Sequence, residues 1–533
     1  MRYRNIYSLF REQTAKYSET PVFYTRDAIG WVPETWAEFE DRVHDLACAL
    51  AASGLNKGAS VAILAGNLPE WSICDIGAIA AGGVGVGIYP TSSAEQCDYV
   101  IKHSDAEFVI VDSVSQFEKI NALSGGFAKV KKILCIEDGS YSDFLEFGRT
   151  KRSEFLPLIE TAARAAEPDD IAIMVYTSGT TGQPKGAMLS HRYILNSVES
   201  LRQAVPVFDT DTAISYLPGC HVAERISGIY NRLYNGAPAY FVEDLSKLYS
   251  YMLEIKPTVF ASLPRFFEKI HAKVVGEAGT SDVETQAVKD AFGGNIRLLT
   301  SGGAPLPQEI ADFFERHDLP ILQAYGLTEN ICVAFNTVAE HKFGTVGKPM
   351  PMTEVKIAAD GEILVKSEMM FSGYYKDPEK TVEMFNEDGW LKTGDLGEQD
   401  ADGFLKITGR KKEIIVLSSG KNVAPALVEN FVKESHLISH CYLHGDGRSY
   451  CVALITINQT EAAGFCREQI DGLVGQIVEK ANSRVSGPEK IKKFFILDDD
   501  FSAEREEITP TMKLKRNVVA TNYKSILEKL YDH

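Results

Sequence analysis

Short runs of β-branched and other apolar residues alternate with helical patterns along much of the chain. Examples of the runs are SVAILAG at 60–66, EFVIVD at 107–112, KKILCIED at 131–138 and PTVFASL at 257–263. Other segments, such as residues 36–54, repeat apolar side chains with a helical period. Strands that alternate with helices form βαβ units, whose strands run parallel because each helix returns the chain to the same edge of the sheet. The sequence therefore predicts an α/β fold with a large N-terminal part built on mostly parallel sheets.

The character of the sequence changes after about residue 389. The segment GWLKTGDLGEQDADGFLKITGR is polar and rich in turn residues, and Asp402 with Gly403 is typical of a hairpin turn. Farther on, the patterns predict a strand at 413–419, a helix at 426–438, a hairpin around 445–447 and a second helix before residue 492. These elements make a small α+β domain. We therefore expect an N-terminal domain of residues 1–410 and a C-terminal domain of residues 411–533.

The charge of the chain limits its partners. The formal net charge is −18 at pH 7, and the resulting field repels nucleic acid and anionic membranes. We therefore expect no nucleic-acid partner. Any anionic substrate must be held by local positive charge.

Cysteine usage and hydropathy indicate the compartment. The nine cysteines are odd in number and include no CxxC pair, which is typical of reduced thiols in a cytoplasmic protein. Residues 1–17 have the pattern of an amphipathic helix and not of a secretion signal, and the apolar residues 75–90 are too few and too rich in glycine to span a bilayer. We expect a soluble cytoplasmic protein whose first helix at most makes a peripheral membrane contact. The sequence leaves a monomer and a homodimer open.

Two weaker patterns resemble binding motifs without meeting their requirements. GGVGVG at 82–87 has glycines near the dinucleotide-binding spacing, but it follows a helical pattern and not a strand, so we interpret it as close packing. His436, His440, Cys441 and His444 form the densest group of metal-ligand residue types. Their alternation is typical of a strand, and we expect no zinc there.

A loop rich in glycine and hydroxyl residues follows the apolar run IAIMVY. The segment YTSGTTGQPKGAM, residues 176–188, offers backbone N–H groups, hydroxyls and one lysine, all of which bind phosphate. It is not a P-loop, because Pro184 stands where the second glycine of that motif belongs. A plain surface loop would not need TSGTTG between a strand and PKG. We predict a phosphate-binding loop formed by Thr177, Ser178, Gly179, Thr180, Thr181, Gly182 and Lys185.

The extended segment YTSGTTGQPKGAMLSH resembles the phosphate loop of the adenylate-forming enzymes, which include acyl-CoA synthetases, adenylation domains and firefly luciferase. Further matching segments follow in family order over nearly the whole chain: SYLPGCHVAERI, LTSGGAPLP, QAYGLTEN, GWLKTGDLG, GRKKEIIVLSSGKNVAP and ITPTMKLKR. Within the superfamily the chain is most similar to bacterial long-chain fatty acid–CoA ligases. The resemblance implies an N-terminal AMP-binding domain and a C-terminal domain that rotates during the reaction.

The resemblance also implies the nucleotide contacts. SGGAP at 301–305 offers backbone without bulky side chains against which a purine can lie, and Tyr325 offers an aromatic face. A carboxylate such as Asp395 can accept hydrogen bonds from both ribose hydroxyls. In the family, residues at these positions bind adenosine, and an arginine matching Arg410 assists. The implied ATP-binding residues are Gly302, Gly303, Ala304, Tyr325, Gly326, Thr328, Asp395 and Arg410.

Glu329 follows Thr328 in QAYGLTEN. Mg²⁺ prefers a few carboxylate oxygens together with phosphate oxygens over a full protein cage. The family uses the matching glutamate for this purpose. The resemblance implies that Glu329 and Thr181 are the Mg²⁺ ligands.

Catalytic roles follow from the same resemblance. His221 in LPGCHVAER matches a histidine near the α-phosphate and the acyl carboxylate. Lys513 in TMKLKR matches the lysine that reaches the reacting carboxylate, and Lys515 is the alternative assignment. Lys412 matches the hinge of the C-terminal domain. Gly420 lies in the segment that lines the pantetheine tunnel of coenzyme A, where the absence of a side chain lets a narrow ligand pass.

One position departs from the pattern of the long-chain enzymes, which usually read LPLxHxxER. Glu224 and Arg225 agree with that pattern, whereas Gly219 does not. Gly219 therefore leaves open whether the acyl pocket has the same local shape as in the long-chain enzymes. We nevertheless expect saturated acids of roughly C12 to C18, because each buried CH₂ adds about 0.8 kcal/mol.

The implied activity is ATP-dependent activation of a fatty acid to acyl-AMP, followed by transfer to coenzyme A with release of AMP and pyrophosphate. A medium-chain or aryl acid–CoA ligase would keep every motif and change the pocket. A fatty acyl-AMP ligase would instead load a carrier protein. An inactive homologue is disfavoured because Lys185, Glu329, Asp395 and Lys513 are all present.

Overall fold

The computed structural model describes residues 2–123, 126–177, 183–278, 284–304, 306–509 and 513–532. The chain forms two compact units. Unit 1 comprises Met1–Thr177, Pro184–Val355 and Val365–Trp390, and unit 2 comprises Ser178–Gln183, Lys356–Leu364 and Leu391–His533. The domain boundary predicted between residues 410 and 411 stays a prediction.

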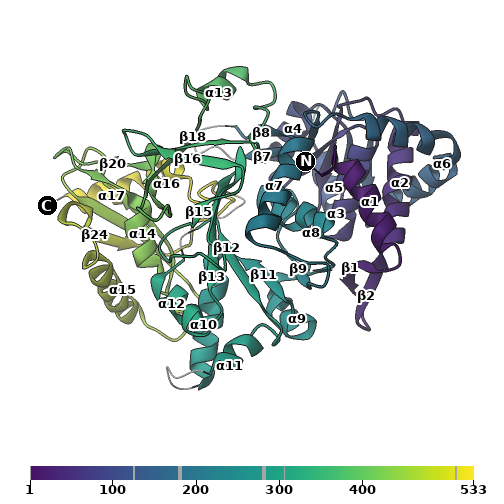
Figure 1. Ribbon diagram of the computed structural model, residues 1–533. Coiled ribbons are helices and arrows are strands. Elements are labelled where there is room, and N and C mark those ends of the chain that lie inside the picture. Colours follow the sequence, from purple (N-terminus) through teal and green to yellow (C-terminus); the bar gives the residue numbers. More distant parts are fainter. Residues whose placement is uncertain are drawn as a thin grey trace. The chain divides into compact units, whose positions relative to one another are not determined.

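A six-stranded sheet in unit 1 has the order β6-β5-β3-β4-β7-β8, of which Figure 1 labels β7 and β8. Its strands are β3 (Ser60–Leu64), β4 (Val84–Ile88), β5 (Ala106–Val111), β6 (Lys132–Cys135), β7 (Ile171–Thr177) and β8 (Lys185–Ser190). The first five are parallel, as the alternation of strands and helices predicts, and β8 returns antiparallel to β7. GGVGVG runs into the buried strand β4, where a Cβ at Gly85 would lie 2.1 Å from Asp75. Close packing therefore explains Gly83, Gly85 and Gly87, whereas Gly82 has φ +80° and open space around it.

A nine-stranded sheet in unit 1 has the order β15-β14-β13-β12-β11-β9-β10-β1-β2. Its strands are β1 (Pro21–Arg26), β2 (Trp31–Thr35), β9 (Ala213–Ser215), β10 (Ala239–Phe241), β11 (Val259–Ser262), β12 (Leu298–Gly302), β13 (Ile321–Leu327), β14 (Asn330–Phe335) and β15 (Lys348–Pro349). The six central strands are parallel, and β2, β14 and β15 are antiparallel additions. The carboxyl ends of β11, β12 and β13 thus share one edge.

Helices cover both sheets of unit 1. They are α1 (Ile6–Tyr17), α2 (Trp36–Ala52), α3 (Pro69–Ala80), α4 (Ala94–His103), α5 (Val114–Asn121), α6 (Ser140–Ala165), α7 (His191–Ala204), the π-helix η1 (Ala223–Tyr230), α8 (Asn231–Asn235), the 3₁₀ turn η2 (Leu245–Lys247), α9 (Leu248–Ile255), α10 (Pro264–Ala278), α11 (Thr285–Asp290), α12 (Gln308–Arg316) and α13 (Pro378–Glu383). The predicted helices at 1–17 and 36–54 are confirmed as α1 and α2. No helix among the described residues is long and apolar enough to cross a membrane.

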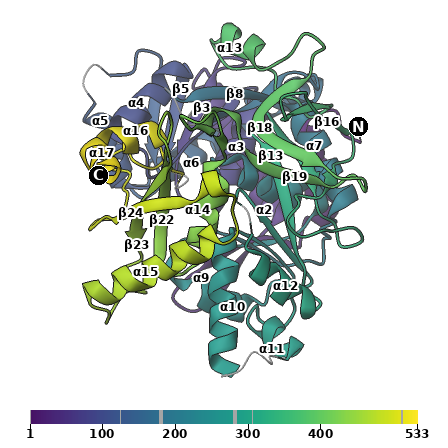
Figure 2. The same cartoon turned by 90° about the vertical axis from the view of Figure 1, so that its left-hand side faces the viewer.

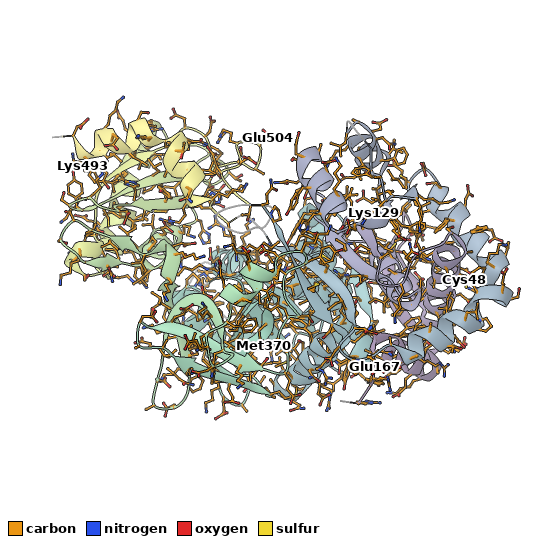
Figure 3. The ribbon with its side chains drawn as sticks, turned by 90° about the horizontal axis from the view of Figure 1, so that it is seen from above. Cys48, Lys129, Glu167, Met370, Lys493 and Glu504 are labelled. Carbon is orange, nitrogen blue, oxygen red and sulfur yellow. The ribbon has the colours of Figure 1, made fainter. Side chains whose placement is uncertain are left out.

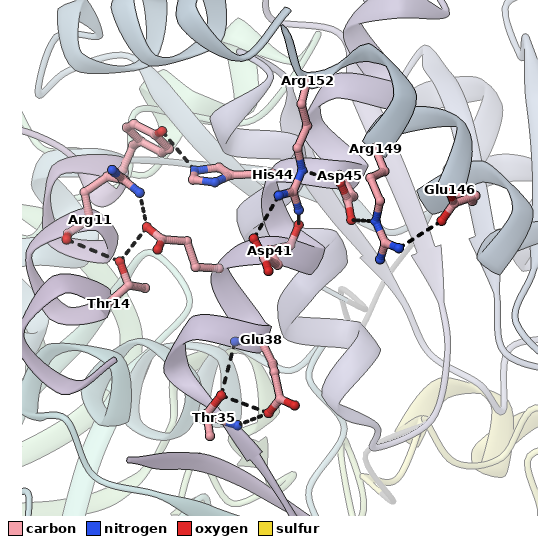
Figure 4. A network of polar contacts seen from close by, with 12 residues as sticks. Arg11, Thr14, Thr35, Glu38, Asp41, His44, Asp45, Glu146, Arg149 and Arg152 are labelled. Atoms are coloured by element: carbon pink, nitrogen blue, oxygen red, sulfur yellow. Dashed lines mark hydrogen bonds and ion pairs between the residues drawn. The ribbon is translucent and has the colours of Figure 1, made fainter. Parts of the chain in front are cut away.

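Helix α2 carries buried polar side chains that join it to its neighbours (Figure 4). A capping box of Thr35 and Glu38 starts the helix by satisfying backbone N–H groups. Six residues after Glu38, His44 lies 3.2 Å from the Tyr7 hydroxyl of α1. Asp45 accepts a hydrogen bond from Arg152 of α6. The first, second and sixth helices are therefore tied together by buried polar contacts as well as by apolar packing.

Unit 2 contains three small sheets. A four-stranded sheet, β16-β17-β18-β19, is built mostly from its segments, a two-stranded sheet pairs β20 with β21, and a third has the order β22-β23-β24. The strands are β16 (Thr353–Ile357), β17 (Glu362–Ser367), β18 (Leu391–Gln399), β19 (Leu405–Arg410), β20 (Ile415–Val416), β21 (Asn422–Val423), β22 (Ile438–His444), β23 (Cys451–Ile457) and β24 (Ile491–Ile496). The hairpin predicted at Asp402 and Gly403 joins β18 to β19, and Gly403 has φ +88°. The hairpin around 445–447 joins β22 to β23.

Helices lie on both faces of the third sheet (Figure 2). Unit 2 holds η3 (Lys411–Glu413), α14 (Pro425–Lys433), α15 (Arg467–Asn482), η4 (Gly487–Glu489), α16 (Arg516–Asn522) and α17 (Lys524–Tyr531). Apolar side chains of α14 and α15 pack with Cys441 on one face, and those of α16 and α17 pack with Tyr442 on the other. Figure 3 marks Lys493 on β24 and Glu504 in the segment before α16.

Two predictions for unit 2 are wrong in extent. The strand predicted at 413–419 is only the two residues of β20, because the chain turns at Gly420 to pair with β21. The helix predicted at 426–438 ends at Lys433, because Ile438 already begins β22. In both places a strand pairing from farther along the chain overrides the local pattern.

Candidate active site

The predicted phosphate loop joins two antiparallel strands. Thr177, the last residue of β7, pairs with Lys185, the first residue of β8, so the lysine lies on the second strand of a hairpin. Ser178, Gly179, Thr180, Thr181 and Gly182 lie outside the described residues. A Cβ at Gly186 would lie 2.6 Å from the Met174 sulfur, so this glycine packs closely against β7.

A segment from much later in the chain runs along β8. The Met188 amide donates to the Gly373 carbonyl at 2.9 Å, and the Tyr375 amide donates to the Gly186 carbonyl at 2.8 Å. Ala187 and Tyr374 form an antiparallel bridge between these contacts. The segment thereby fixes Tyr374 beside the phosphate hairpin.

Tyr374 contacts two of the predicted site residues. Its ring centroid is 5.0 Å from the Lys185 Nζ, and its hydroxyl donates a hydrogen bond to the Glu329 carboxylate. Tyr374 is 5% exposed and Glu329 is 7% exposed. Burial, then the adjacent Glu329 charge, raises the pKa of Tyr374 well above its ordinary value, so the hydroxyl stays protonated and acts as a donor.

Thr328 and Glu329 form the two-residue turn between β13 and β14. Leu327 pairs with Asn330 across this turn, and a Cβ at Gly326 would lie 1.9 Å from the Ile331 carbonyl oxygen, so only glycine fits there. The Tyr193 hydroxyl of α7 donates to the Thr328 carbonyl at 3.0 Å and accepts from the Ile331 amide at 3.0 Å. The carboxylate of Glu329 is therefore presented by a tightly held turn.

The predicted adenine-binding residues lie at one edge of the nine-stranded sheet. Gly302 ends β12 and pairs with Ala324 of the parallel strand β13, next to Tyr325. Gly303 and Ala304 follow Gly302 in the chain, and Gly303 has φ +77°. Ligands of α/β proteins bind outside the carboxyl ends of such strands. Among the described residues, the buried hydroxyl of Ser301 has no hydrogen-bond partner, which leaves a polar group at this edge.

His221 lies just before the π-helix η1. The Ala223 amide donates to its Nδ1 at 3.1 Å, so a neutral His221 ring carries its proton on Nε2. Four residues later, Arg225 is fully buried and forms an ion pair with Asp75, with Nε 3.0 Å from Oδ2. The Tyr230 hydroxyl also donates to Asp75, at 2.7 Å. These contacts hold both the first turn and the last residue of the π-helix that follows His221.

The departure at Gly219 has a packing cause. A Cβ at this position would lie 2.6 Å from Cδ2 of Trp71, whose ring also lies under the Arg225 guanidinium, with Cζ 4.9 Å from the ring centroid. Trp71 is 1% exposed. The indole therefore occupies the volume that a leucine side chain at position 219 would need.

In unit 2, three predicted residues lie together. Asp395 of β18 pairs across the hairpin with Arg410 of β19, and the Arg410 Nε is 3.0 Å from the Asp395 Oδ1. The pKa of Lys513 is lowered, first by loss of hydration and then by the Arg410 charge, whereas Asp395 and Glu413 oppose the shift. Lys513 as a whole is exposed, so solvent screens these charges.

The remaining predicted residues of unit 2 lie in turns. Lys412 is an exposed residue of η3, the 3₁₀ turn between β19 and β20. Gly420 has φ +76° in the turn between β20 and β21, a conformation that favours glycine independently of any ligand. Lys515 is the residue before α16, and its Nζ is 3.9 Å from Glu506.

The group of histidines and Cys441 lies on or next to β22. His440 Nδ1 is 2.8 Å from Asp500, and His444 Nδ1 is 3.1 Å from the Tyr531 hydroxyl. No group of three or more His, Cys, Asp or Glu residues in the described part of the chain is arranged to hold a metal ion. A Mg²⁺ site would thus need oxygens from a substrate besides Glu329.

The local patterns did not single out Tyr374, Tyr193 or Trp71. Tyr193 contacts Thr328 and Trp71 contacts Gly219, each more than a hundred positions away, and Tyr374 contacts Glu329, 45 positions away. The only signal for Tyr374 was that it lies in a short aromatic segment, FSGYYKD, between two motifs.

The comparisons with known proteins agree with this arrangement. The AMP-binding enzyme family matches residues 10–375, and the AMP-binding enzyme C-terminal domain matches residues 412–533. The chain is 35% identical to long-chain-fatty-acid–CoA ligase FadD15 of Mycobacterium bovis, over 96% of this chain and 94% of the relative. It is 32% identical to human long-chain-fatty-acid–CoA ligase ACSBG2, over 98% and 91%.

Solved structures share the fold. A crystal structure of ATP-bound MatB from Rhodopseudomonas palustris has a TM-score of 0.76 and 24% identity, covering 97% of this chain and 99% of that one. Its likeness extends over both units. Together with the family matches, this shows that the chain belongs to the AMP-binding enzyme family, within the adenylate-forming superfamily.

Proposed function

We propose that this protein is an AMP-forming long-chain fatty acid–CoA ligase. The observation that carries the proposal is the identity of about a third, over nearly the full length, to relatives that are named long-chain-fatty-acid–CoA ligases. The site residues support an activating enzyme, because the two strands that flank the phosphate loop, a buried carboxylate and the carboxyl ends of β12 and β13 are contributed by one unit.

In the first step, an oxygen of the fatty acid carboxylate attacks the α-phosphorus of ATP, and the bond from that phosphorus to the bridging oxygen of pyrophosphate breaks. Lys185 and the hydroxyls of the phosphate loop bind the phosphates. His221 and Lys513 stabilise the charge on the α-phosphate and the carboxylate. The strand edge at Gly302 and Tyr325 binds adenine, and Asp395 with Arg410 binds the ribose.

Glu329 and Thr181 would hold Mg²⁺, which supplies positive charge against the phosphate oxygens. The carboxylate fits this role because it is buried, lies on a rigid turn and accepts a hydrogen bond from Tyr374. A carboxylate oxygen is a hard donor, the kind that Mg²⁺ prefers.

In the second step, the thiolate of coenzyme A attacks the acyl carbon, the carbon–oxygen bond to AMP breaks, and the thiol proton passes to solvent. We propose that a rotation about Lys412 separates the two steps, moves Lys513 away and brings Gly420 to the pantetheine arm. Lys412 suits a hinge because it is an exposed residue in a short turn between two hairpins.

Lys513 is favoured over Lys515 as the catalytic lysine. The charges that act on Lys513 include Asp395 and Arg410, the proposed ribose contacts, whereas the Lys515 ammonium is near Glu506. The test is alanine substitution of each lysine, with adenylate formation lost only for Lys513.

The cellular setting completes the proposal. We propose a cytoplasmic enzyme that collects acyl substrates with, at most, a peripheral contact through α1, and that uses no nucleic acid. Retention of the enzyme on membranes after a high-salt wash would contradict a cytoplasmic enzyme with at most a peripheral membrane contact. A homodimer is testable by light scattering of the purified chain.

The deciding experiment is a panel of acids from acetate to C18, assayed for AMP, pyrophosphate and acyl-CoA. We expect kcat/KM to peak between C12 and C18. A peak at an aryl or medium-chain acid would support the alternative ligases, and acyl-AMP without acyl-CoA would support a ligase that loads a carrier protein.

A further inference from the structure

Lys185 and Glu329 carry opposite charges and both contact Tyr374, on different parts of the same side chain. The ammonium lies 5.0 Å from the ring centroid, where the negative face of the ring attracts it. The carboxylate accepts the hydrogen bond of the hydroxyl. Between these two described side chains the structure gives no ion pair.

An ion pair between Lys185 and Glu329 would oppose the function proposed above. Glu329 is buried, so little water screens its carboxylate from a nearby ammonium, and the two would attract each other. Such a pair would neutralise both the cation that binds phosphate and the anion that binds Mg²⁺. Binding of MgATP would then have to break it first.

We propose that Tyr374 is a positioning residue that holds Lys185 and Glu329 apart and ready for MgATP. This inference rests on the proposed function, because it assumes that the lysine binds phosphate and the glutamate binds Mg²⁺. The ring supplies a weak, replaceable partner for the ammonium, and the hydroxyl orients the carboxylate while leaving its second oxygen for another ligand.

The backbone around Tyr374 fits a spacer that does not move. Its amide donates to the Thr381 hydroxyl at 2.9 Å, and its neighbours are hydrogen-bonded to β8 on both sides. The Phe371 amide also donates to the Glu329 carbonyl at 2.9 Å, which ties the same segment to the turn of β13 and β14. Tyr374 is thus fixed to both elements whose side chains it separates.

The test uses Tyr374→Phe, which keeps the ring, and Tyr374→Leu, which removes both ring and hydroxyl. The matched control is Tyr375→Phe, which removes the adjacent hydroxyl and its 3.0 Å hydrogen bond to Asp105. Each enzyme is assayed for acid-dependent exchange of pyrophosphate into ATP while Mg²⁺ and ATP are varied separately. Acyl transfer from synthetic acyl adenylate to coenzyme A is measured in parallel.

For Tyr374→Phe we expect the KM for Mg²⁺ to rise about tenfold, since a hydrogen bond to a charged group is worth roughly that factor or more. For Tyr374→Leu we expect the KM values for both Mg²⁺ and ATP to rise, because the ammonium also loses its partner. Acyl transfer from the adenylate should stay near the wild-type rate, and Tyr375→Phe should behave as wild type in both assays.

Unchanged KM values for Mg²⁺ and ATP in Tyr374→Phe and Tyr374→Leu would overturn the inference. A parallel loss in both half-reactions would also overturn it, because that result indicates a purely structural role. Failure of the wild-type protein to exchange pyrophosphate with any acid would instead overturn the proposed function. The two failures are therefore distinguishable.

Discussion

Three cations predicted for the site in unit 2 are more exposed than two buried charged groups at and near the site in unit 1. In unit 1, Arg225 and Asp75 are fully buried, and Glu329 is covered by Tyr374. In unit 2, the Arg410 side chain is 50% exposed, and Lys412 and Lys513 are exposed. Buried charges need fixed partners, whereas exposed charges can exchange partners at little cost. The buried groups of unit 1 are thus suited to keep one geometry, and the exposed cations Arg410, Lys412 and Lys513 are suited to act in one step and withdraw in the next.

The largest effect is expected at the buried pair. Arg225→Met leaves Asp75 as an unpaired buried charge, which should lower the free energy of unfolding by about 3–5 kcal/mol. Denaturant unfolding measures the loss. Adding Asp75→Leu removes the unpaired charge and should restore part of the lost unfolding free energy. If Arg225→Met is as stable as wild type, the buried Arg225–Asp75 pair does not contribute the expected ~3–5 kcal/mol to the free energy of unfolding.

The second-largest effect on stability is expected from the protonation of two buried histidines. Burial, followed by the charges of Arg11 and Arg152, lowers the pKa of His44 to about 4, and burial lowers the pKa of His191 to about 4. Below pH 6.5 the unfolded chain binds these protons and the folded chain does not, so stability falls as pH drops from 6.5 to 4, by roughly 3 kcal/mol per histidine.

The measurement is denaturant unfolding of wild type and His44→Gln across this pH range. The variant cannot take up that proton, so its stability should fall less steeply. The site in question is the buried network of α2 in unit 1 (Figure 4). Identical slopes for the two proteins would show that His44 titrates normally in the folded state.

Gly219→Leu tests the contact with Trp71. Added side-chain atoms would overlap the indole, and overpacking costs about 1–3 kcal/mol. Trp71→Ala in the same chain makes room, so the two substitutions should be less destabilising together than their sum. A double-mutant cycle on the unfolding free energy checks this. Strict additivity would mean that the two side chains do not compete for one volume.

The smallest change in stability is expected in unit 2. Arg410→Ala removes an ion pair whose arginine side chain is 50% exposed and whose aspartate is 6% exposed, so water can partly replace the arginine and the unfolding free energy should fall by about 1 kcal/mol. The KM for ATP should nevertheless rise, because the proposed ribose contact loses its neighbour. A large loss of stability with an unchanged KM would reverse the contrast between the units.

Much of the fold could be predicted from local patterns. The β-branched runs at 60–66 and 107–112 became β3 and β5, because a buried parallel strand needs a continuous apolar stretch. The helix predicted to reach residue 438 ended at Lys433, since pairing of β22 with β23 depends on residues from farther along the chain.

The candidate site shows the same limit. Motifs identified Lys185, Glu329 and Asp395, because those residues lie within short recognisable segments. They did not identify Tyr374, which contacts both Lys185 and Glu329. They also did not identify Trp71, whose ring fills the space beside position 219 and so explains the glycine there. A local pattern carries no information about a partner that only the folded chain brings near.

Measuring both half-reactions in Lys513→Ala and Lys412→Pro tests directly whether the C-terminal domain takes a different setting for each step. Removing one positioned charge donor costs about 10² to 10³ in rate, so Lys513→Ala should lose adenylate formation by that factor and still convert synthetic acyl adenylate to acyl-CoA near the wild-type rate. Proline fixes φ at the hinge, so Lys412→Pro should form adenylate and fail in thioester formation. If both variants impair both steps equally, the proposed division of the reaction between two settings of the C-terminal domain is contradicted.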